Sequence, residues 1–159
     1  MIEIEQYIYD MTEAGEAIIL YRMSFDNGTV AEVCNLGATT LSVKSATGDA
    51  TKQGLDIIAL DSATKQLSSH IWDSRVEVNR VVMTTSAEND TLQVEAVFDL
   101  DSECNFEVTY RAVSCKPTTL WVASEPCYNL LKSDEITLRS VEIGEQELLT
   151  LHILYNLKE

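Results

Sequence analysis

The strongest pattern in the chain is the alternation of apolar and polar residues in its second half. In residues 92–100 (LQVEAVFDL) and again in residues 104–112 (CNFEVTYRA), every second side chain is apolar. Because successive side chains of a strand point to opposite faces, this pattern is typical of half-buried antiparallel strands. We predict strands at both segments and two further strands at residues 135–143 and 147–157.

Shorter apolar segments in the first half are separated by turn residues. Residues 17–25 stop at the Asp-Asn-Gly sequence of residues 26–28, which is a strong hairpin signal. Further strands are predicted at residues 29–36 and 38–46, the second ending at a glycine turn. The first half is therefore also expected to be built from strands joined by tight turns.

The segment LDIIALDSATKQLSS, residues 55–69, predicts two kinds of structure. Residues 55–60 form a nearly continuous apolar run, typical of a strand buried on both faces. The Asp-Ser pair that follows predicts one or two helical turns over residues 61–69. With no internal repeat or linker, the whole pattern predicts a single all-β domain over residues 1–159, an antiparallel β-sandwich or curved double sheet.

The chain is strongly acidic, with 26 Asp and Glu against 11 Lys and Arg and a net charge of -15. Such a charge repels nucleic acid and anionic lipid, so we expect neither as a partner. No apolar run approaches the ~20 residues that a membrane span needs. The N-terminal segment MIEIEQYIYD lacks the basic and apolar regions of a signal peptide, which predicts a cytoplasmic protein without membrane attachment.

Neither the cysteines nor the histidines indicate a metal site. The four cysteines contain no CxxC pair and have no zinc-like spacing with the two histidines. We therefore predict no metal ion and no cofactor. Cys34 and Cys104 are expected to be buried thiols, the commonest state of such residues.

The segment between the strand at residues 104–112 and the next one predicts a hairpin, with the chain returning from about residue 118. Matching the two apolar faces sets the register, because a slip of one residue would expose every core side chain. The apolar face then pairs Tyr110 with Leu120 and Val108 with Val122. The polar face holds the cross-strand pairs Thr109–Trp121, Glu107–Ala123 and Asn105–Glu125.

This polar face contains the components of a sugar-binding site. The ring of Trp121 could stack on the C–H side of a pyranose, while Glu107, Asn105 and Glu125 could hydrogen-bond its hydroxyl groups. The alternative is an ordinary solvated sheet face, on which an exposed Trp covers a neighbouring strand.

Three segments, in the same order, resemble aldose 1-epimerases (galactose mutarotases). Residues 27–49 contain an Asn-Gly turn, an Asn-x-Gly-Ala step at residues 35–38 and a second glycine turn. Residues 55–67 resemble the family's buried strand and the turn after it, and residues 106–130 resemble a strand, a Lys-Pro-Thr turn and the strand of the catalytic histidine. The resemblance extends from about Ile18 to Leu131 with one large gap.

The resemblance implies a mutarotase fold, but it also implies the loss of catalysis. The family opens a pyranose ring with a carboxylate base and a histidine acid. Glu125 stands at the position of that histidine, and a carboxyl of ordinary pKa is ionised at pH 7 and cannot donate a proton. The stretch of the family's sugar-binding arginine and second histidine is reduced to SSHIWDSR, in which His70 could be a relic of the sugar site or a loop residue without function. The chain also ends before the family's catalytic glutamate.

Together these observations predict a shortened, mutarotase-like protein that binds a neutral mono- or oligosaccharide without epimerase activity. Two alternatives stay open. The chain could be a structural or protein-interaction module, with the apolar strand at residues 147–157 pairing across a homodimer axis. It could also be an active epimerase with a rearranged site, in which Glu125 or Glu107 is the base and His70 the acid.

Overall fold

The computed structural model describes residues 2–45, 48–49, 59–62, 67, 70–103, 105–124 and 137–156. In this part of the chain every regular element is a strand and every strand pairing is antiparallel. The predicted all-β architecture of packed antiparallel sheets is confirmed. No helix among the described residues is long and apolar enough to cross a membrane.

The strands form three sheets. The first sheet, in spatial order, contains β1 (Ile2–Met11), β2 (Ala17–Phe25), β3 (Val30–Cys34), β4 (Thr39–Ser45) and β5 (Gly48–Asp49). The second contains β13 (Leu148–Asn156), β10 (Asn105–Ser114), β9 (Leu92–Leu100), β8 (Arg80–Ala87) and β7 (Asp73–Glu77). The third contains β12 (Thr137–Ile143), β11 (Thr118–Ser124) and β6 (Ala59–Ser62).

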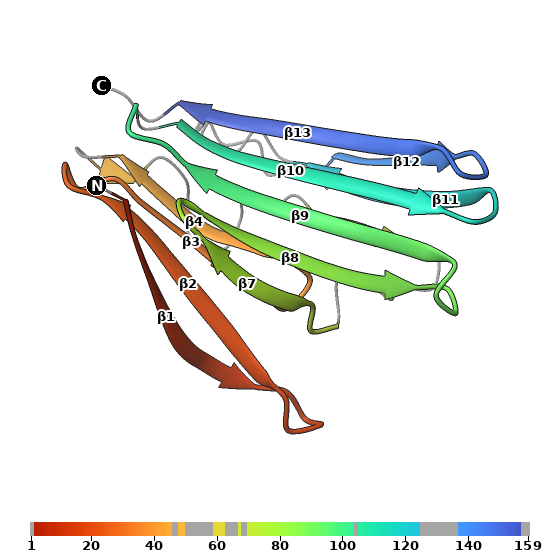
Figure 1. The fold of residues 1–159 in the computed structure, drawn as a ribbon, viewed down its shortest axis with the longest axis horizontal. Coiled ribbons are helices and arrows are strands. Elements are labelled where there is room, and N and C mark those ends of the chain that lie inside the picture. Colours follow the sequence, from red (N-terminus) through yellow and green to blue (C-terminus); the bar gives the residue numbers. More distant parts are fainter. Residues whose placement is uncertain are drawn as a thin grey trace.

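All three sheets contribute to one apolar core. Met23 comes from the first sheet, Phe98 and Tyr110 come from the second, and Leu120 and Ile143 come from the third; all five are at most 2% exposed. Figure 1 shows the second sheet extended across the view and the β1–β2 hairpin reaching away from the other strands. The alternating pattern predicted for β9 and β10 is confirmed, since their burial alternates residue by residue.

The hairpin predicted at residues 26–28 is present between β2 and β3. The amide N–H of Phe25 donates to the carbonyl of Thr29 at 2.9 Å, and Gly28 has φ of 97°. A positive φ is easily adopted by glycine because it has no Cβ. The Asp-Asn-Gly signal therefore located this turn correctly.

Other expectations need correction. Asp61 and Ser62 lie in β6 and do not begin a helix, while most of residues 63–69 lie outside the described part. Strands β1, β7 and β8 were not predicted. Charged or polar residues follow one another in each of these strands, at Glu5–Gln6, Asp73–Arg75 and Thr84–Ser86, and interrupt the alternation that marked the other strands.

The predicted hairpin between β10 and β11 is wrong. β10 lies between β9 and β13, so that Tyr110 is opposite Ala96 and Leu151. β11 belongs to the third sheet, where Leu120 is opposite Val141 and Ser62. The apolar pattern determines which face of a strand is buried, but any other strand with the same pattern can supply the partner. Here β9 and β13 do so, and the chain after β10 crosses to another sheet.

Hydrogen bonds around the Asn-x-Gly-Ala step join the sheets. The side-chain oxygen of Asn35 accepts a hydrogen bond from the Ile19 N–H at 2.8 Å. The backbone carbonyl of Asn35 accepts one from the Trp72 N–H, also at 2.8 Å. The Tyr110 hydroxyl donates to the carbonyl of Ala38 at 2.7 Å. Gly37 and Ala38 have positive φ values of 69° and 49°. This motif is therefore a structural junction in the fold.

Candidate functional site

The structure separates the residues of the predicted sugar site. Asn105 and Glu107 lie on β10 in the second sheet, whereas Trp121 lies on β11 in the third. Glu125 is outside the described residues, and His70 lies in the bend before β7. The predicted pairs Thr109–Trp121 and Glu107–Ala123 are not formed, because β10 and β11 do not pair.

Asn105 and Glu107 lie on the polar face of β10, opposite the face that enters the core. The Asn105 side chain donates to Asp101 Oδ2 at 3.2 Å, and its backbone N–H donates to Asp101 Oδ1 at 2.9 Å. These bonds close the turn between β9 and β10, so Asn105 has a structural role. Glu107 is opposite Asp99 on one side and Leu154 on the other.

Trp121 has different neighbours. In the register of the third sheet it is opposite Ser140 of β12 and Asp61 of β6. The residues opposite Trp121 are therefore Asp61 and Ser140, and not Thr109 as the sequence pattern predicted.

The segment around His70 is bound to the first sheet through its backbone. The His70 carbonyl accepts a hydrogen bond from the Gly37 N–H at 2.9 Å, and Leu36 and Ile71 form an isolated β-bridge. Trp72 is 1% exposed and donates from Nε1 to the Leu67 carbonyl at 2.9 Å. The imidazole of His70 is exposed, so this segment anchors a loop and leaves a histidine at the surface.

The polar face of the second sheet brings together charged residues that the sequence alone did not place side by side. We call Glu77, Arg80, Asp99 and Glu107 the charged row, because each is opposite the next in the registers of β7, β8, β9 and β10. Arg80 Nε lies 2.9 Å from Glu77 Oε1, and Arg75 Nε lies 3.0 Å from Glu77 Oε2. These two arginines lower the pKa of the Glu77 carboxyl.

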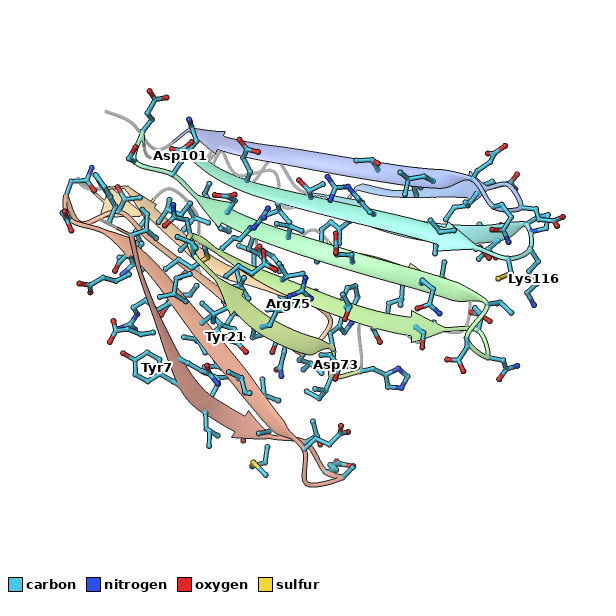
Figure 2. All side chains as sticks on the ribbon, viewed as in Figure 1. Tyr7, Tyr21, Asp73, Arg75, Asp101 and Lys116 are labelled. Atoms are coloured by element: carbon cyan, nitrogen blue, oxygen red, sulfur yellow. The ribbon has the colours of Figure 1, made fainter. Side chains whose placement is uncertain are left out.

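Asp99 lies in the middle of the charged row, and the pKa of its carboxyl is raised, in contrast to that of Glu77. Burial raises the pKa of its carboxyl, Arg80 lowers it, and the nearby carboxylates of Glu107 and Asp101 raise it further. The raising effects prevail. Beside Asp99 is a hollow of about 270 Å³, lined by Glu77, Val78, Asn79, Arg80 and Asp99. Figure 2 shows side chains projecting from this sheet, with Arg75 labelled on β7.

The charged row can hydrogen-bond to hydroxyl or cationic groups of a ligand. It offers no ring for a sugar to stack on, because none of the polar-face residues of β7, β8, β9 and β10 is aromatic. Among the described residues, no group of three or more His, Cys, Asp or Glu side chains is arranged to hold a metal ion. Cys34 is buried and unbridged, and burial raises the pKa of its thiol, while Cys104 lies outside the described part.

Asp99 had been placed on the polar face by the alternation in residues 92–100. Its two charged neighbours, Arg80 and Glu107, are set by the pairing of β9 with β8 and β10, which no local sequence signal indicates. The pairing of Arg80 with Glu77 is local, because β7 and β8 form a hairpin around Val78 and Asn79.

The architecture of antiparallel sheets around one core is a galactose mutarotase-like fold, as comparison with a solved structure shows. The structure is similar to that of galactose 1-epimerase from Lactobacillus acidophilus NCFM, with a TM-score of 0.53 and 20% sequence identity. The match covers 78% of this chain and 52% of that protein, so the chain spans about half the length of the epimerase it matches. No protein-family model matches the chain, and neither does any curated protein sequence.

Proposed function

We propose that this protein is a mutarotase-like carbohydrate-binding protein without aldose 1-epimerase activity. The observation that carries the proposal is the likeness of its fold to that of a galactose 1-epimerase. The resemblance argues against activity, because it implies that Glu125 stands where the family has its histidine acid. The net charge of -15 favours a neutral sugar over a sugar phosphate.

We place the proposed sugar contact at Trp121 of β11 and at Glu125, which follows this strand in the sequence and lies outside the described residues. Trp121 is opposite Asp61 and Ser140 in the third sheet, and these residues are candidates for hydrogen bonds to the hydroxyl groups of a sugar stacked on the indole. Asn105 and Glu107 belong to a separate polar surface on the second sheet. Their contribution to binding, and that of His70, is expected to be smaller than that of Trp121.

A ¹⁵N–¹H NMR titration with galactose, glucose and a β-linked disaccharide tests the proposal. We expect shifts of the Trp121 indole signal and of amides in β11, and loss of those shifts in Trp121→Ala. Tyr9→Ala is the matched control, because Tyr9 is an aromatic residue that is 61% exposed on the first sheet. An unchanged wild-type spectrum with all three sugars, or undiminished binding by Trp121→Ala, would contradict the proposed site.

Polarimetry on fresh α-galactose and α-glucose tests the absence of catalysis. We expect the uncatalysed rate of mutarotation in the presence of the protein. A faster rate that falls in His70→Ala and Glu107→Ala would instead support the active epimerase with a rearranged site.

A second candidate function is that of an interaction module which dimerises through β13. The observation in its favour is that β13 is the last strand of its sheet in the described part of the chain, with β10 as its neighbour. Dimerisation there would protect the outward amide groups of β13, so their hydrogen exchange should slow as protein concentration rises. Sedimentation equilibrium showing a monomer at all concentrations would exclude this candidate.

A further inference from the structure

The end of the β1–β2 hairpin is a two-stranded arm. β3 pairs with β2 from Val30 to Cys34, and this ladder ends at Leu20. Asn35, the residue after β3, still bonds to both the N–H and the carbonyl of Ile19. Beyond Ile19, in the part of the chain that the structure describes, β1 and β2 pair only with each other, through Asp10–Ile18 and Met11–Ala17. We call residues 8–18 the distal arm; its turn is closed by the Thr12 N–H donating to the Glu16 carbonyl at 2.8 Å. Figure 1 shows this arm reaching away from the other strands.

The arm exposes large apolar side chains. Ile8 is 73% exposed, Tyr9 61% and Met11 52%, and Tyr7, just before them, is 41% exposed. Single exposed apolar residues are normal on protein surfaces, but here four lie within five consecutive positions of one strand, and because side chains alternate they expose apolar surface on both faces of the hairpin. A two-stranded hairpin is also only marginally stable in water by itself. Both facts indicate a surface that gains stability when another chain covers it.

The backbone of β1 offers the way to cover it. Among the described strands, β1 is an edge strand of ten residues with β2 as its one neighbour in the first sheet. Proteins usually protect such an edge with Lys or Pro, and residues 2–11 contain neither. One bulge, between Ile8 and Asp10, interrupts the ladder with β2. An exposed edge of this kind can accept an additional strand through main-chain hydrogen bonds.

Charge determines which strand fits. Residues 2–25 contain five carboxylates, at positions 3, 5, 10, 13 and 16, and a single basic residue, Arg22. Arg22 is already engaged, because its guanidinium lies 2.9 Å from Glu32 on β3 and 5.5 Å from the centre of the Tyr7 ring. A second copy of this chain would bring the same five carboxylates and a further charge of -15 to the interface. A basic strand would instead place its cations opposite these carboxylates.

We propose that the edge of β1 binds an extended segment of another protein, in which Lys or Arg alternates with β-branched or aromatic residues. The apolar side chains of that segment cover Ile8 and Tyr9, its cations face Glu3, Glu5 and Asp10, and its backbone extends the first sheet by one strand. Because β1 and β11 belong to different sheets, this interaction is independent of the proposed sugar site.

Fluorescence anisotropy with the full chain tests the proposal. The probe is a labelled peptide of about ten residues, the length of β1, in which Lys alternates with Val and Thr. One comparison peptide carries Glu in place of Lys. A second is N-methylated along one edge, so that it keeps its charges and side chains but cannot pair with a strand. We expect binding of the Lys peptide only, and weaker binding as salt is added.

Variants locate the site. Ile8→Lys/Tyr9→Lys is expected to weaken binding about tenfold or more. The matched control, Val78→Lys/Leu148→Lys, adds the same charge at two apolar residues that are 90% and 60% exposed on the second sheet, and should bind nearly as the wild type does. Glu3→Gln/Asp10→Asn should reduce both the affinity and the salt dependence, whereas Glu103→Gln/Glu145→Gln should have little effect.

Four results would overturn the proposal. The Lys peptide could fail to bind, the Glu or N-methylated peptide could bind equally well, or both Lys double variants could weaken binding equally. Equal weakening by the two Lys double variants would show that the peptide is attracted to net charge alone. The fourth is self-association of the chain that Ile8→Lys/Tyr9→Lys abolishes, which would make a second copy the partner of β1. Loss of the Trp121 sugar response would leave this proposal unaffected, which keeps the two tests separate.

Discussion

The Tyr110 hydroxyl donates a 2.7 Å hydrogen bond to the carbonyl oxygen of Ala38, 72 residues earlier in the chain. Tyr110 is 1% exposed on β10, and Ala38 precedes β4 in a left-handed conformation with φ of 49°. The bond therefore joins the second sheet to the first through the Asn-x-Gly-Ala step. A motif that resembles part of an enzyme family is used here to hold two sheets together.

Tyr110→Phe is expected to lower the free energy of unfolding by about 1–3 kcal/mol, because it leaves the buried carbonyl of Ala38 without this donor. Urea denaturation of the variant and the wild type measures the difference. Tyr9→Phe is the control, since Tyr9 is 61% exposed and the change should stay within about 0.5 kcal/mol. Equal effects of the two substitutions would contradict a structural role for the Tyr110 bond.

Glu32 links stability to acid pH. Burial raises the pKa of its carboxyl, but hydrogen bonds from Ser42 and Arg22 outweigh burial and hold the pKa below its ordinary value. A carboxyl with a lowered folded-state pKa stabilises the protein above its unfolded value of about 4.3, and this contribution is lost as pH falls through the folded value.

Glu32→Gln should therefore be less stable than the wild type by about 0.2–1 kcal/mol at pH 7, and the difference should vanish in acid. Denaturation curves between pH 7 and pH 3 provide the measurement. Glu145→Gln, an exposed change in the turn before β13, should show no such pH-dependent difference. A difference that persists unchanged at the lowest pH would rule out the ionised carboxylate as its source.

Glu107→Gln should lower the pKa of Asp99, since the Glu107 carboxylate is one of the two negative groups that raise it. The shift should be partial, because burial, the largest cause, remains. A carboxyl with a raised folded-state pKa makes stability fall as pH rises through the folded value. The fall in stability that Asp99 causes as pH rises should therefore be smaller in Glu107→Gln than in the wild type. NMR titration of the Asp99 carboxyl carbon measures the effect, with Glu103→Gln as the exposed control.

A double-mutant cycle tests the strand pairing directly. Glu107→Gln and Trp121→Ala should have additive effects on the free energy of unfolding to within about 0.5 kcal/mol, because β10 and β11 lie in different sheets. Glu107→Gln and Asp99→Asn, on directly opposite residues, should be coupled. Coupling in the first pair and additivity in the second would instead favour the hairpin that the sequence pattern predicts.

The sequence was sufficient where structure depends on neighbouring residues. The alternation in residues 92–100 and 104–112 predicted β9 and β10 and their buried faces, because the two-residue period is a property of the extended backbone itself. The Asp-Asn-Gly turn was equally local, since only its own residues need the unusual backbone conformation. The all-β class followed from these elements together.

Only the tertiary structure decided which strands are neighbours. β10 could have paired with β11, β9 or β13, because all of them present an apolar face of the same period. The choice of β9 and β13 placed Glu107 beside Asp99 and left Trp121 beside Asp61. Pairing of this kind depends on competition among segments far apart in the chain, so the sequence determined the faces of the strands and the packed fold determined their partners.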